Sequence, residues 1–236
     1  MEIYTENEND LNPDLNHVSC GQTNVHVDPY RIYDKIINED DDIYDHEVIA
    51  LNEMESVIKA ETSDDLKIIV DFYSEYFPDA SLNWLDVSRI TDMSYLFYNT
   101  TYNGDISRWN VSNVKNMEYM FFGSKFNKDI SRWDVSNVKN MTGMFWYSVF
   151  TGDISGWDVS EVRNMSFMFY GSYFDGDISG WNVSNIENME SMFYSSHFTH
   201  DISKWHVSHV MFYSDIFTDC QISEKHKPKF KNKLII

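Results

Sequence analysis

Tryptophan recurs every 24 residues along the second half of the chain, and the apolar and polar positions around it recur with it. The copies open as WDVSNVKNMTGMF at Trp133, WDVSEVRNMSFMF at Trp157 and WNVSNIENMESMF at Trp181. A fixed period of this size indicates a solenoid, in which each copy needs its neighbours to bury its apolar face.

Each copy contains two apolar periods. Trp133 and Val135 alternate with polar residues, as in a short strand with one face buried. Val138, Met141 and Phe145 then follow at helical spacing. We therefore expect an α/β repeat solenoid of leucine-rich-repeat type, with one short parallel strand and one short helix in each 24-residue coil.

The pattern divides the chain into four parts. Residues 1–27 are acidic, and we expect them to be flexible. Residues 28–80 read as a helical region that caps the array, with a last helix that begins near Ser63 and stops before Pro78. Residues 81–223 form the solenoid, with five full copies and a degenerate sixth. The basic segment 224–236 is either a tail or a final cover for the edge of the array.

The string DISxWDVSxVxNMxxMF resembles the BspA-type leucine-rich-repeat family, over about residues 82–223. Known relatives are surface and adhesion-type proteins, and no enzymatic activity accompanies the repeat. The resemblance implies a non-catalytic protein–protein interaction solenoid. The chain also lacks a G-x-S-x-G motif, a glycine-rich phosphate loop and a C-x-x-C pair, so we expect no enzyme and no cofactor.

Charge narrows the class of partner. The net charge is −20, and residues 1–80 hold 21 acidic and 4 basic residues, a net −17. Such a chain repels phosphate backbones, so we expect a protein partner and no nucleic acid. No apolar run approaches the length of a membrane span, which argues against membrane insertion. The start MEIYTENEND lacks the features of a signal peptide, which favours a cytoplasmic or virus-associated protein over classical secretion.

Equivalent positions of successive copies form columns, and comparing the copies separates columns that keep one residue type from columns that vary. The tryptophans, methionines and phenylalanines of the repeat are expected to form the core. One aspartate per copy either closes a turn or contributes to a calcium ladder. The histidines of the last copies suggest zinc ligands or ordinary surface variation, and overall we expect neither calcium nor zinc. The aspartates are Asp105, Asp129, Asp153, Asp177 and Asp201, and the histidines are His197, His200, His206 and His209.

An aromatic column after each Met-Phe pair either covers the seam between coils or forms an exposed stripe. It comprises Tyr98, Phe122, Trp146, Tyr170 and Tyr194.

Candidate partner-binding residues are the polar side chains on either side of the tryptophan, because this surface differs between copies. They are Arg108, Asn110, Arg132, Asp134, Asp158, Asn182, Lys204 and His206. The alternative function is that of a structural component in a larger assembly, such as a viral particle or a cell envelope.

Overall fold

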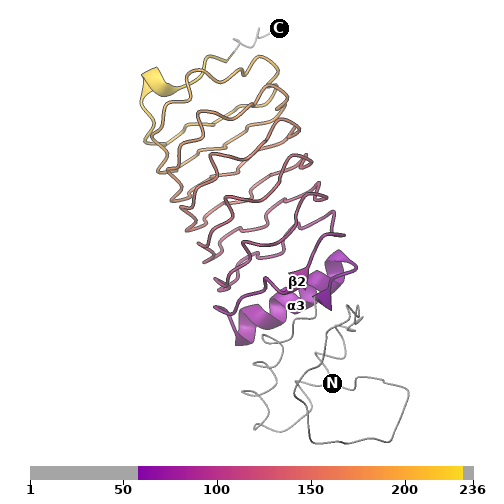
Figure 1. The fold of residues 1–236 in the computed structure, drawn as a ribbon. Helices are drawn as coiled ribbons and strands as arrows, with labels where there is room; N and C mark the ends of the chain where they lie inside the picture. The colour runs from indigo at the N-terminus through magenta and orange to yellow at the C-terminus, as the bar shows by residue number, and fades with distance from the viewer. Residues whose placement is uncertain (1–57, 231–236) are drawn as a thin grey trace, which may run out of the picture. The chain divides into compact units, whose positions relative to one another are not determined.

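The computed structural model describes residues 58–230. Its elements are β1 (Ile58–Lys59), α3 (Ser63–Tyr76), β2 (Leu85–Asp86) and the 3-10 helix η1 (Glu224–His226). By its internal contacts the chain divides into Met1–Lys59 and Ala60–Ile236. Within the second unit, coils stack one upon another from α3 toward η1 (Figure 1). The flexible segment expected at 1–27 and the helices expected before residue 58 lie outside the described residues, as do residues 231–236.

Helix α3 confirms the last helix expected from the sequence, with its cap one residue earlier than predicted. Thr62 is the N-cap and forms a capping box with Asp65, in which each side chain accepts the other residue's backbone N–H. The helix ends at Tyr76, just before Pro78, which favours an extended residue in front of it.

This helix covers the first coil of the array (Figure 1). The Ser63 hydroxyl donates a hydrogen bond of 2.7 Å to the carbonyl of Asp92, and the Thr101 hydroxyl donates one of 3.1 Å to the carbonyl of Ser74. The two bonds involve opposite ends of the helix. Its apolar side chains are buried beside them, so α3 supplies the apolar contact that a terminal coil lacks. These side chains are Leu66, Ile69, Val70, Phe72 and Tyr73.

The repeat solenoid is confirmed, but the short strand and short helix expected in every coil are wrong. Among residues 58–230, α3 is the sole α-helix, and the coils consist mainly of turns. Strand-like pairing is reduced to one parallel bridge per pair of neighbouring coils, and it falls on the Asn-Met position instead of the tryptophan segment. The bridges join Asp92, Asn116, Asn140, Asn164, Asn188 and Phe212 in succession.

A run of overlapping turns replaces the expected helix. In the segment 117–124, Met120, Phe122 and Ser124 donate their backbone N–H groups to the carbonyls three residues earlier. The residues between them, such as Tyr119 and Phe121, donate to carbonyls of the next coil. Every second N–H is thus available between coils, whereas a helix would use nearly all of them internally. The methionines and phenylalanines remain at a spacing that also suits a helix, which explains the incorrect prediction.

The turns require a left-handed backbone at two positions in each coil. At the first of these, φ is +51° at Tyr119, +58° at Gly143 and +59° at Phe167. Glycine adopts this conformation without steric cost, but a bulky side chain does so rarely. Gly143 also leaves room for the Tyr119 ring, because a Cβ at this glycine would lie 2.3 Å from it.

The tryptophans form a buried ladder that is hydrogen-bonded as well as stacked. The rings of Trp109 and Trp133 are 6.4 Å apart and nearly parallel. Each indole Nε1 donates to a backbone carbonyl 27 residues earlier; Trp157 donates to Ile130 at 3.1 Å. The same carbonyl accepts the backbone N–H of Trp133, so both of its lone pairs are used. The ladder therefore fixes the register between coils.

Phenylalanines and methionines fill the remaining core, as the sequence predicts. Phe121 and Phe145 stack at 5.6 Å with nearly parallel rings, and Phe145 also packs on Phe150 at 4.7 Å. Stacked aromatic pairs contribute about 0.5–1.5 kcal/mol each beyond the area that they bury. The fully buried columns are Met117, Met141, Met165, Met189, Phe121, Phe145, Phe169, Phe193, Phe126, Phe150, Phe174 and Phe198.

The basic C-terminal segment packs against the last coil over its described part, residues 224–230, as the edge-cover interpretation expects. The carbonyl of His226, in η1, accepts the backbone N–H of Ile202 at 3.0 Å. Phe230 stacks on Tyr213 at 4.6 Å, and the Lys227 ammonium lies 5.4 Å from the ring centre of Phe217. This segment covers part of the C-terminal end of the array.

Removing one indole N–H from the tryptophan ladder should lower stability. Trp157→Phe leaves an aromatic ring in the core but removes the bond to Ile130, and we expect a loss of about 1–2 kcal/mol in the free energy of unfolding measured in urea. Trp146→Phe is the matched control, since the Trp146 Nε1 has no hydrogen-bond partner. Equal losses in the two variants would show that the hydrogen bond contributes nothing.

Candidate partner-binding face

The eight predicted binding residues lie at the surface, on either side of the buried tryptophan ladder. We call the surface formed by these two columns the Trp-flanking face. All eight residues are exposed: Arg108, Asn110, Arg132, Asp134, Asp158, Asn182, Lys204 and His206. Since the coils repeat in register, equivalent side chains of neighbouring coils follow one another along the array.

The cations of this face form no close ion pair with a carboxylate in the described part of the chain. Within residues 58–230, no carboxylate lies within 4.0 Å of the charged groups of Arg108, Arg132 or Lys204. Glycines 156 and 180 occupy the same column in the coils between. Charge on this column therefore changes along the array while the backbone stays the same.

The polar residues after each tryptophan also shape the backbone. The side-chain oxygen of Asp134 accepts the backbone N–H of Ser136 at 3.1 Å, and Asp158 does the same with Ser160 at 3.0 Å. These are Asx turns, in which a short polar side chain replaces a backbone acceptor. His206 stands in this column in the last copy and is exposed.

An asparagine in several coils fixes the backbone beside this face. The sequence suggested Asn137 only as a possible helix cap, not as a link between coils. The amide of Asn137 donates to the carbonyl of Ser112 at 2.8 Å, and that of Asn113 donates to Ser88 at the same distance. Recurrence of Asn at this position is the signal that could have found it. An exposed asparagine otherwise reads as an ordinary surface residue.

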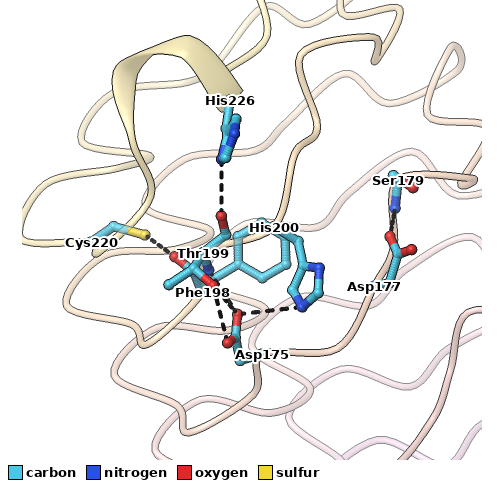
Figure 2. Close-up of polar contacts among 8 residues, drawn as sticks. All are labelled: Asp175, Asp177, Ser179, Phe198, Thr199, His200, Cys220 and His226. Carbon is cyan, nitrogen blue, oxygen red and sulfur yellow. Dashed lines mark hydrogen bonds and ion pairs between the residues drawn. The ribbon is translucent and has the colours of Figure 1, made fainter.

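The repeated aspartate column closes turns, as one of the two sequence interpretations holds. Asp129 accepts the N–H of Ser131 at 2.9 Å. Asp177 accepts that of Ser179 at the same distance (Figure 2). The pKa of Asp129 is lowered first by the hydrogen bond from the backbone N–H of Ser131 and then by the hydrogen bond from the Ser131 side chain. Within residues 58–230, no three His, Cys, Asp or Glu side chains are grouped as metal ligands.

The histidines of the last coils take separate roles. His197 stacks on Tyr173 at 4.8 Å. His200 lies 3.9 Å from Asp175, whose carboxylate accepts hydrogen bonds from both the backbone and the hydroxyl of Thr199 (Figure 2). The two Thr199 bonds join one coil to the next. His197 also contacts the preceding coil, since its Nδ1 lies 3.2 Å from the carbonyl of Ser172.

The aromatic column after each Met-Phe pair covers the seam between coils and also remains accessible. Its rings contact one another from coil to coil. Tyr98 and Phe122 stack at 4.6 Å and Tyr170 and Tyr194 at 4.7 Å, while Trp146 meets its neighbours edge-on or tilted. Tyr98 is exposed and the others are half-buried. The two interpretations of this column are therefore compatible.

Acid should weaken the aspartate turns. Because its folded pKa lies below the ordinary value of 3.8, Asp129 contributes full stability at neutral pH and loses it as the pH falls below about 4. Asp129→Ala should lower the free energy of unfolding by about 0.5–1 kcal/mol at pH 7. Asp129→Asn should keep the turn and reduce the difference in unfolding free energy between pH 7 and pH 3. Asp79→Asn controls for net charge, and an Asp129→Ala protein as stable as wild type at pH 7 would contradict the role of the turn.

Among residues 58–230, no helix has the length and apolar character that crossing a membrane requires.

Comparison with known proteins gave no match among curated proteins and none among solved structures. A family described as "Mycoplasma protein of unknown function, DUF285" matches residues 64–172 and 146–230, which include nearly all of α3 and every coil. The chain therefore belongs to this family of repeat proteins.

Proposed function

We propose that the solenoid is a non-catalytic module that binds another protein through the Trp-flanking face. One observation carries the proposal: the columns that repeat unchanged are buried or hydrogen-bonded, while the column before the tryptophan is exposed and varies in charge. A rigid backbone with a varied surface suits specific recognition, because little conformational entropy is lost on binding.

The partner is a protein rather than a nucleic acid, since the net charge of −20 repels phosphates. We further propose that the repeat is of the BspA type, which its DISxWDVS string supports. We infer from that relationship an adhesion-type role. We propose that this chain performs it without inserting into a membrane.

The cations of the Trp-flanking face should be required for binding. In affinity capture from the native source, Arg108→Ala, Arg132→Ala and Lys204→Ala combined should reduce recovery of specific partners at least about tenfold, the equivalent of 1.4 kcal/mol. A combined Lys125→Ala, Lys128→Ala and Lys139→Ala variant removes the same charge from other exposed positions and should retain them. Partners that both variants retain would rule this face out.

A second candidate function is that of a structural subunit, which the last coil favours. In internal coils, alternate N–H groups donate to the next coil, but the equivalent N–H groups of Asp215, Phe217 and Asp219 have no acceptor within residues 58–230. Unpaired backbone donors at the edge of an array can pair with another chain. Multi-angle light scattering at micromolar concentration should then show an assembly, and a strict monomer would count against this function.

A further inference from the structure

A continuous row of partly exposed aromatic rings runs along the coils, at the overlapping turns. We call it the aromatic ridge. It consists of Tyr95, Tyr98, Tyr119, Phe122, Trp146, Tyr147, Phe167, Tyr170 and Tyr194. None of these side chains belongs to the buried core. The ridge includes the aromatic column after each Met-Phe pair and lies on a different segment of the coil from the Trp-flanking face.

Ring contacts join the ridge from the first coil to the fifth. In one row, Phe122 lies 5.3 Å from Trp146, which lies 4.9 Å from Tyr170. A second row runs beside it, with Tyr119 6.0 Å and Phe167 5.0 Å from Trp146. Trp146 therefore stands at the centre, where both rows meet.

Several ridge residues adopt a backbone conformation that their side chains disfavour. The φ angles of Tyr95, Tyr119, Tyr147 and Phe167 lie between +51° and +59°. Glycine meets the same requirement at residues 143 and 171, so an aromatic residue is not needed for the turn. Unfavourable backbone conformations concentrate at functional sites. Packing alone does not explain the rings either, since Tyr95 is 45% exposed and Tyr147 54% exposed.

The centre of the ridge holds an unused hydrogen-bond donor. Each tryptophan of the buried ladder donates its Nε1–H to a carbonyl, but the Nε1 of Trp146 has no partner. Among the described residues it is the sole buried side-chain nitrogen or oxygen in this state. An unpaired indole N–H is a donor that the carbonyl of a bound peptide can satisfy.

Carboxylates border the ridge. Glu118 directly precedes Tyr119, and its backbone carbonyl accepts the N–H of Tyr95 at 2.9 Å. Desolvation, followed by the charge of Glu118, raises the pKa of both tyrosines. The pKa of Tyr170 is raised by desolvation, then by the neighbouring tyrosines and, to a smaller extent, by the charge of Asp219. Within residues 58–230, Lys227 over Phe217 is the one cation–π contact, and Phe217 lies outside the ridge. No described lysine or arginine therefore occupies the face of a ridge ring.

We propose that the aromatic ridge binds an arginine- or lysine-bearing polypeptide segment of a partner protein. Cations bind the faces of aromatic rings, and adjacent carboxylates strengthen that attraction. The strongly acidic chain draws such a segment toward the surface. The Trp146 indole then pairs with a backbone carbonyl of the segment.

The test measures binding of a synthetic (Gly-Ser-Arg) repeat peptide to the full chain by calorimetry. Loss of a ridge ring should weaken binding about two- to fivefold, so Tyr98→Ala with Tyr147→Ala should weaken it about tenfold. Tyr173→Ala is the matched control, because Tyr173 is 57% exposed but lies outside the ridge. Equal affinity in the ridge variant and the control would overturn the proposal and leave only general attraction to an acidic protein.

Two further measurements distinguish binding at the ridge from binding elsewhere on the chain. The indole N–H resonance of Trp146, assigned through Trp146→Phe, should move downfield on addition of the arginine peptide, and a resonance that does not respond would count against the ridge. The combined Arg108, Arg132 and Lys204 variant should bind the peptide at least as tightly as wild type. The proposal for the Trp-flanking face can therefore fail while the proposal for the ridge stands. The ridge proposal can likewise fail while the other stands.

Discussion

Backbone hydrogen bonds between successive coils are the interaction on which the rest of this structure depends. From Met117 to Asn127 every N–H has an acceptor, and the acceptors alternate between the neighbouring coils and the coil's own turns or side chains. Buried donors without partners would cost more than the fold can recover, so this complete pairing permits a core with almost no regular secondary structure. The tryptophan ladder adds a second set of bonds between coils and prevents slippage by even one residue.

A fixed register has direct consequences for recognition. Any side chain pointing outward is repeated at each coil, so a surface property becomes a row rather than a point. On the Trp-flanking face the row carries interrupted positive charge, from Arg108 to Lys204. On the aromatic ridge it carries polarisable rings beside Glu118 and Asp219. The two proposed surfaces therefore differ in their charge preference although they lie on one scaffold.

How far the sequence predicts this molecule depends on the range of the interactions involved. Helix α3 and its apolar face could be predicted because capping and periodicity are local, although Thr62 takes the cap expected near Ser63. Burial of the tryptophan, methionine and phenylalanine columns and exposure of the eight face residues could also be predicted. The turns could not, because the spacing of Met141, Met144 and Phe145 suits a helix equally well. What favours turns is a carbonyl supplied by the next coil, and a single copy contains no sign of it.

The most direct measurement is the scalar coupling across hydrogen bonds, by nuclear magnetic resonance on the isotopically labelled chain. We expect a coupling between the amide nitrogen of Phe121 and the carbonyl carbon of Met144, whose oxygen lies 2.9 Å away in the next coil. Tyr119 and Thr142 should give a second coupling of the same kind. A coupling from Phe121 to the carbonyl of Met117 in its own coil would instead mean a helix and would contradict the pairing between coils on which the fold rests.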